Sequence, residues 1–142
     1  QGIQQALGAS LAAPDRKVLC LTGDGGLALN IGELAALVQE RANVLIILMN
    51  DGGYGVIRNI QDAQFGARHY FVDLHNPDFA GFAKSLQIPH ARVTDLANLQ
   101  GPLAELMAIQ GPAILEIDMV KVGPFAAAYA GPPDGKADKA KA

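Results

Sequence analysis

The sequence predicts an α/β fold, in which a parallel sheet is flanked by helices on both faces. Apolar runs at residues 17–22 and 43–49 are typical of strands that are buried on both faces. Between them apolar residues recur at helical spacing, and residues 113–119 form a third strand-like run. A strand, a helix and a strand in close succession make a βαβ unit, so we expect the strands to be parallel.

The other elements follow in chain order. Residues 3–13 predict a helix that stops at Pro14, and Asn30 with Glu33 predicts a cap for the helix between the first two strands. Further along, the sequence predicts a short helix, a weak strand and a longer helix at residues 78–86, 91–94 and 96–110. Residues 131–142 are mainly Gly, Pro, Asp, Lys and Ala, which predicts a flexible tail after a single domain of residues 1–130.

Composition excludes several classes of protein. Of 142 residues 50% are hydrophobic and 18% charged, which is enough apolar material for one buried core. The net charge of −3 gives no support to nucleic-acid binding, and no apolar run is long enough to span a membrane. A single cysteine, Cys20, cannot form an internal disulfide. Without a signal peptide, we expect a cytoplasmic domain. Because it starts inside an expected helix, we expect it to be a piece of a longer subunit.

A glycine-rich turn follows the first predicted strand. Gly23, Gly25 and Gly26 surround Asp24 at the carboxyl end of that strand, where open α/β sheets bind ligands. Glycines let the backbone turn sharply and bring amide groups close to a bound anion. A simple strand-to-helix turn without a ligand is the plain alternative.

A dinucleotide site is another alternative, because Gly23, Gly25 and Ala28 fit the loose G-x-G-x-x-G/A pattern. The carboxylate of Asp24 argues against it, since this charge would face a pyrophosphate. Two unit charges about 4 Å apart interact by roughly 4 kcal/mol at an effective dielectric of 20. Asp51 could contact the ribose only if Asp24 were neutralised.

A divalent cation removes this repulsion. Asp24 follows the first strand and Asn50 follows the second, so both side chains should emerge at one edge of adjacent strands. A carboxylate and an amide oxygen are ligands that Mg²⁺ accepts, and it usually shares its sites with phosphate oxygens. Neither loop contains Lys or Arg, so the cation would have to balance a diphosphate. The sequence therefore predicts a site for Mg²⁺ and a diphosphate.

The spacing of Gly23-Asp24-Gly25 and Asn50-Asp51 resembles the GDG…NN motif of thiamine-diphosphate-dependent enzymes. The stretch 50–58, Asn-Asp-Gly-Gly-Tyr-Gly-Val-Ile-Arg, resembles the acetolactate synthase and benzoylformate decarboxylase branch, as does the helix at 6–14. The resemblance covers residues 2–119. It implies a thiamine-diphosphate-binding fold and the diphosphate-binding domain, the C-terminal third of a longer subunit.

The resemblance assigns a role to each matching position. It implies that Asp24, Asn50 and the Gly52 carbonyl bind Mg²⁺. The positions implied to hold the cofactor are Gly23, Asp24, Gly25, Gly26, Leu27, Asn50, Gly52, Tyr54 and Gly55. Val56 and Ile57 match positions that line a substrate pocket. Gly26 stands where relatives often have Ser, and Asp51 replaces the second Asn of the motif.

The resemblance also implies a 2-oxo acid decarboxylase or carboligase that works as a homodimer or homotetramer. The glutamate that activates the cofactor is expected in the pyrimidine-binding domain of a partner subunit, so no catalytic residue is expected in this chain. We therefore expect the isolated chain to be inactive. A non-catalytic α/β assembly module and a dinucleotide-binding domain of an oxidoreductase remain alternatives. We expect a solvated or substrate-adjacent loop around His69, Asp73 and His75. A metal site formed by these three residues is the alternative.

Overall fold

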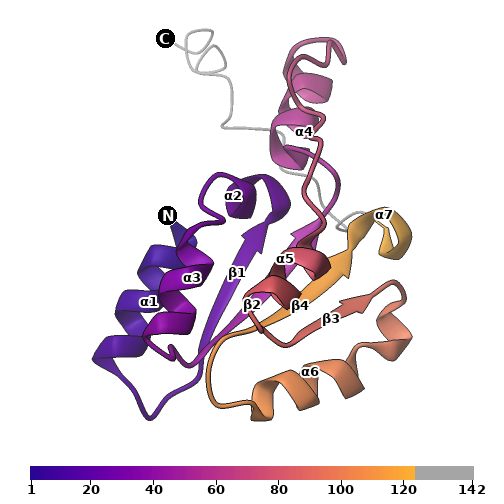
Figure 1. Ribbon diagram of the computed structural model, residues 1–142. Helices are drawn as coiled ribbons and strands as arrows, with labels where there is room; N and C mark the ends of the chain where they lie inside the picture. Colours follow the sequence, from indigo (N-terminus) through magenta and orange to yellow (C-terminus); the bar gives the residue numbers. More distant parts are fainter. Residues whose placement is uncertain (124–142) are drawn as a thin grey trace, which may run out of the picture.

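Within residues 1–123, which the computed structural model describes, the strands form one parallel sheet in the order β1-β2-β4-β3 (Figure 1). These strands are β1 (Val18–Gly23), β2 (Val44–Asn50), β3 (His90–Val93) and β4 (Ala113–Asp118). All of them pair in parallel, as the apolar runs predicted. The expected tail at 131–142 and the end of the expected domain lie outside the described residues.

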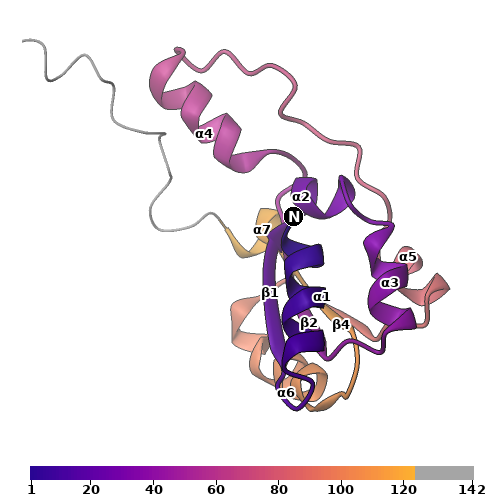
Figure 2. The same cartoon turned by 90° about the vertical axis from the view of Figure 1, so that its left-hand side faces the viewer.

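Helices cover both faces of the sheet, as predicted (Figure 2). One face packs against α1 (Gly2–Ala12), α3 (Glu33–Gln39) and α5 (Phe79–Ser85). The opposite face packs against α6 (Gln100–Ala108), which follows the short 3₁₀ helix η1 (Leu96–Asn98). Successive strand residues alternate between the two cores, so Ile46 contributes to the first and Leu45 to the second.

The prediction that β1 is buried on both faces is wrong. Cys20 is buried, as its place in an apolar run predicts, but Leu19 and Leu21 are 55% and 70% exposed. The reason is position: β1 forms an edge of the sheet in the described part of the chain, and α6 lies against β3 and β4 instead. The central strand β4 is buried along its whole length.

Two local predictions also need correction. Asn30 does not cap a helix: α3 begins after Gly32, and the Asn30 side chain instead accepts a hydrogen bond from Gln4 Nε2 (2.9 Å). The helix expected at 96–110 is divided into η1 and α6. Pro102 lies in the first turn of α6, where its missing N–H costs no intrahelical bond.

The remaining helices are α2 (Asp24–Ala28), α4 (Gly55–Gln64) and α7 (Met119–Val122). The sequence patterns do not predict α4, because Gly52 and Gly53 before it favour a loop. It has no buried residue and projects from the carboxyl edge of the sheet (Figure 1). No helix in the described residues has the length and apolar character needed to cross a membrane.

Candidate functional site at the carboxyl edge of the sheet

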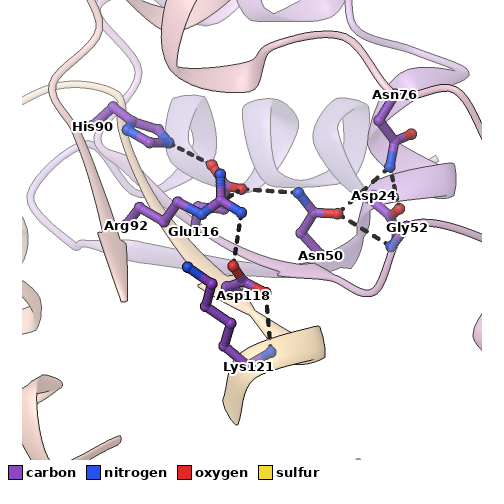
Figure 3. A network of polar contacts seen from close by, with 9 residues as sticks. All are labelled: Asp24, Asn50, Gly52, Asn76, His90, Arg92, Glu116, Asp118 and Lys121. Carbon is purple, nitrogen blue, oxygen red and sulfur yellow. Dashed lines mark hydrogen bonds and ion pairs between the residues drawn. The ribbon is translucent and has the colours of Figure 1, made fainter. Parts of the chain in front are cut away.

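The structure brings Asp24 and Asn50 together at the carboxyl ends of β1 and β2. Gly23 pairs with Met49 in the parallel register, so the next residue of each strand emerges at the same level. Asn76 links the two side chains: its Nδ2 donates to Asp24 Oδ2 and also lies 3.5 Å from Asn50 Oδ1. The two oxygens predicted to bind a metal therefore point at one nitrogen atom (Figure 3).

Asp24 is a buried carboxylate with little to balance its charge. It is 1% exposed, and within residues 1–123 it forms no ion pair with a basic side chain. The neighbouring Asp51 adds a second acidic group. Burial raises the pKa of Asp51, and the nearby carboxylate of Asp24 raises it further. A cation would relieve this concentration of negative charge.

The amide of Asn50 has a defined orientation. Its Oδ1 accepts a hydrogen bond from the Gly52 backbone N–H (3.3 Å), and its Nδ2 donates to Glu116 Oε1 (2.8 Å). Figure 3 shows Asn50 between Glu116 on one side and the Asp24–Asn76 pair on the other. The oxygen end of the amide is therefore the end directed at the predicted metal position.

Glu116 is held from β3 as well. His90 Nε2 donates to Glu116 Oε2 (2.9 Å), and Arg92 Nε lies 3.6 Å from Oε1. The hydrogen bond from His90 lowers the pKa of Glu116, as do the bond from Asn50 and the charge of Arg92, although burial raises it. His90 therefore has a structural role, and Glu116 stays an ionised acceptor.

Arg92 also pairs with the end of β4. Its Nη2 lies 2.8 Å from Asp118 Oδ2, and the Lys121 backbone N–H donates to Asp118 Oδ1 (3.2 Å). Burial raises the pKa of Asp118, but these hydrogen bonds outweigh it, so the pKa lies below its ordinary value. Asp118 thus joins β4 to β3 and to α7 through these hydrogen bonds.

A pocket of about 340 Å³ opens beside this polar cluster. Its wall contains most of the residues predicted to hold cofactor or substrate, namely Gly23, Gly25, Gly26, Tyr54, Gly55, Val56 and Ile57. Leu21, Thr22, Met49, Asp51 and Gly53 complete it. Leu27 is fully buried and does not line this pocket. Asp24, Asn50 and Gly52 do not line this pocket and lie beside it.

Close backbone contacts shape the pocket at two glycines. A Cβ on Gly25 would lie 2.5 Å from the ring of Tyr54, and one on Gly55 would collide with Asp51 Oδ2. Neither position has room for a side chain unless its neighbour moves. A side chain at Gly25 would therefore have to displace the Tyr54 ring, whereas one at Gly55 would have to turn away only the end of the Asp51 side chain.

Residues 72–76 run back to the carboxyl edge of the sheet and place Asn76 over the site. The Gly52 carbonyl accepts a hydrogen bond from the Leu74 backbone N–H (3.1 Å), and Tyr54 N–H donates to the Val72 carbonyl (2.8 Å). Nothing in the sequence marks Asn76, because a single amide in an expected loop has no distinctive spacing. Glu116 likewise looks in the sequence like an ordinary residue of a strand.

The alternative metal site around His69, Asp73 and His75 finds no support. His69 pairs with Asp62 (2.6 Å), whereas Asp73 pairs with Arg58 (2.8 Å). No group of three or more His, Cys, Asp and Glu residues suited to a metal occurs in the described part of the chain. The Asp24–Asn50 pair relies on an amide oxygen and a backbone carbonyl, which are ligands of a different kind.

The donor set at the sheet edge suits a hard divalent cation. A carboxylate oxygen, an amide oxygen and a nearby carbonyl are oxygen ligands, which Mg²⁺ and Ca²⁺ prefer. The wall of the adjacent pocket includes the acidic side chain of Asp51, but its glycine-rich turn after β1 offers backbone amides that suit an anion. The arrangement can therefore hold a cation and an anionic group side by side.

Comparisons with known proteins assign the chain to a family. Residues 1–117 match the family described as "Thiamine pyrophosphate enzyme, C-terminal TPP binding domain". The chain is 34% identical over 118 residues to the acetolactate synthase isozyme 1 large subunit of Escherichia coli (strain K12), which covers 82% of this chain and 21% of that protein.

Two other similar proteins are also acetolactate synthase subunits. The acetolactate synthase large subunit of Parasynechococcus marenigrum (strain WH8102) is 33% identical over 120 residues, covering 83% of this chain and 19% of that protein. The mitochondrial acetolactate synthase catalytic subunit of Saccharomyces cerevisiae is 28% identical over 130 residues, covering 92% and 19%. The chain thus spans about a fifth of the length of these relatives. It belongs to the thiamine pyrophosphate enzyme family, with residues 1–117 in the C-terminal TPP-binding domain.

Proposed function

We propose that this chain forms the Mg²⁺- and diphosphate-binding half of the active site of an acetolactate synthase-like enzyme, a 2-oxo acid decarboxylase or carboligase. The observation that carries the proposal is the convergence of Asp24 and Asn50 oxygens on Asn76 Nδ2 at the carboxyl edge of the sheet. A donor nitrogen between two acceptor oxygens occupies the kind of position that a cation would take.

Asp24 and Asn50 would bind Mg²⁺ through their side chains and Gly52 through its carbonyl. The charge environment supports this assignment, because Asp24 is buried and has no basic partner within residues 1–123. The carbonyl of Gly52 already accepts the Leu74 N–H, but a carbonyl oxygen has a second lone pair for a metal. Asn76 Nδ2 would move aside as the cation enters.

The pocket wall would hold the rest of the cofactor. Backbone amides around Gly25, Gly26 and Leu27 would bind the diphosphate, and Tyr54 and Gly55 would close its far side. Val56 and Ile57 line the same pocket and are 54% and 46% exposed, so a substrate could reach them. Thiamine diphosphate, when bound, supplies an electron sink for the carbon of a 2-oxo acid carbonyl. The residues of this chain bind and orient it.

A partner subunit would complete the site. The activating glutamate is proposed to come from the pyrimidine-binding domain of that partner in a homodimer or homotetramer. Glu116 is unsuited to that role here, because its carboxylate is 2% exposed and already bound by Asn50 and His90. The isolated chain is therefore expected to release no CO₂ from pyruvate.

The decisive experiment is a calorimetric titration of the full-length subunit with thiamine diphosphate. We expect binding with Mg²⁺, loss of binding with EDTA, and loss of Mg²⁺-dependent binding in Asp24→Ala. Asp15→Ala is the matched control, because Asp15 is an exposed carboxylate outside the site. Unchanged binding in Asp24→Ala would reject the proposal. Tight NAD binding without metal would instead support a dinucleotide-binding domain, and binding of neither cofactor would support an assembly module.

A further inference from the structure

The side chain of Asn50 has two chemically different ends. Its oxygen can bind a cation, whereas its NH₂ group cannot, so a half-turn of the amide would abolish the ligand. Something must therefore hold the amide with its oxygen toward Asp24. The neighbouring contacts identify a single buried group on the other side of Asn50.

That group is Glu116. An ionised carboxylate only accepts hydrogen bonds, so it can pair with the NH₂ group of Asn50 but not with its oxygen. The observed 2.8 Å contact from Asn50 Nδ2 to Glu116 Oε1 is this pairing. At 2% exposure Glu116 has almost no access to water, so a turned amide would leave two acceptor oxygens facing each other without solvent.

Glu116 is itself fixed from the far side. His90 Nε2 donates to its second oxygen at 2.9 Å, and Arg92 Nε lies 3.6 Å from the first. These residues belong to β3, and Glu116 belongs to β4, which lies between β2 and β3. The chain of contacts therefore runs across three adjacent strands and ends at Asn50 (Figure 3).

We propose that Glu116 is a positioning residue, held by His90, that keeps the Asn50 amide oxygen directed at the cation. This inference rests on the proposed Mg²⁺ site. Glu116 does not contact cation or cofactor itself and acts only through Asn50. Substitutions of residues that orient metal ligands typically weaken metal binding by about 10- to 100-fold.

The test measures the Mg²⁺ concentration that gives half-maximal thiamine diphosphate binding in the full-length subunit. Glu116→Met keeps a similar side-chain length but removes the acceptor, and we expect it to raise this midpoint about tenfold or more. Glu116→Gln keeps an acceptor oxygen for Asn50 and can donate to a neutral His90 nitrogen. We expect this conservative variant to stay within about threefold of the wild type.

Asp118→Leu is the matched control. Asp118 is another buried carboxylate of β4; it lies opposite Asn50 in the sheet register, but its hydrogen bonds go to Arg92 and Lys121 and not to the Asn50 amide. We expect this variant to lower the melting temperature while leaving the Mg²⁺ midpoint unchanged. A wild-type midpoint in Glu116→Met, or an equal shift in Asp118→Leu, would overturn the inference.

If Glu116→Met fails to fold, a pair of variants decides instead. Asn50→Asp alone sets two carboxylates against each other and should raise the Mg²⁺ midpoint. Adding Glu116→Gln gives the carboxylate introduced at position 50 a donor again and should restore the midpoint to near the wild-type value. Failure of Glu116→Gln to improve binding in this background would contradict the inference. If instead the wild type shows no Mg²⁺-dependent binding at all, the proposed function itself is rejected.

Discussion

The ring of Tyr54 packs directly against the backbone of Gly25, so that a Cβ on Gly25 would lie 2.5 Å from Tyr54 Cε1. Gly25 belongs to the turn after β1, and Tyr54 follows the end of β2. This contact joins the two loops that form the pocket wall. Even the smallest side chain at Gly25 must therefore displace the ring.

We expect Gly25→Ala to weaken thiamine diphosphate binding by about tenfold or more, because a shifted Tyr54 changes the pocket wall. The fold should persist, since the ring can turn outward. Gly8→Ala is the matched control: nothing lies within 4 Å of its added Cβ, and alanine favours the middle of a helix by about 1 kcal/mol. Calorimetry and thermal unfolding of both variants check this. Wild-type affinity in Gly25→Ala would show that Tyr54 does not shape the site.

Gly26 is expected to behave differently. A Cβ there would lie 3.2 Å from Thr22 Oγ1, an atom at the end of a side chain that can give way. Gly26→Ser adds a hydroxyl donor beside the proposed diphosphate position, and a hydrogen bond contributes about 0.5–1.5 kcal/mol. We therefore expect about two- to tenfold tighter binding of thiamine diphosphate by calorimetry. Weaker binding would place the diphosphate away from Gly26.

Asn76 is the hydrogen-bond donor to the buried carboxylate of Asp24. Its replacement by alanine leaves that carboxylate without this partner, which costs about 1–3 kcal/mol. We expect Asn76→Ala to lower the free energy of unfolding when EDTA is present. With Mg²⁺ and thiamine diphosphate the deficit should shrink, because a bound cation would replace the lost donor. An equal deficit in both conditions, measured by denaturant unfolding, would contradict this role.

The Arg92–Asp118 pair predicts a response to acid. The pKa of Asp118 is lowered in the folded protein, so its contribution to stability is complete above the ordinary carboxyl pKa. That contribution is lost as the pH falls through the pKa of Asp118 in the folded protein. Arg92→Met removes the main stabilising hydrogen bond and should cost about 1–2 kcal/mol at pH 7. Denaturant unfolding curves measured between pH 7 and 3 should show that the difference in the free energy of unfolding between Arg92→Met and wild type becomes smaller in acid. A difference that stays constant with pH would show that the Arg92–Asp118 hydrogen bond is not its source.

The sequence predicts the strands well because buried parallel strands are continuous apolar runs. β2 and β4 are buried as expected, but the burial of β1 was predicted wrongly. An apolar strand carries no sign of whether a neighbour covers its second face. Leu19 and Leu21 look no different in sequence from Leu45 and Leu115.

The site was predictable only where it follows the strand ends. Asp24 and Asn50 each follow an apolar run, and parallel register brings such positions together. Glu116, from β4, and Asn76, from the loop after residues 72–74, both contact the side chain of Asn50. No regular spacing in the sequence relates either residue to Asn50. Their contribution depends on the strand order and on the pairing of residues 52–54 with 72–74, which only the folded chain contains.

A crystal structure of the full-length subunit with thiamine diphosphate and Mn²⁺, in which anomalous scattering locates the metal, tests the proposed site most directly. We expect Mn²⁺ bound directly to the Asp24 carboxylate, the Asn50 amide oxygen and the Gly52 carbonyl, with the diphosphate against Gly25 and Gly26. A metal bound elsewhere, or a diphosphate held away from Gly25 and Gly26, would contradict this assignment.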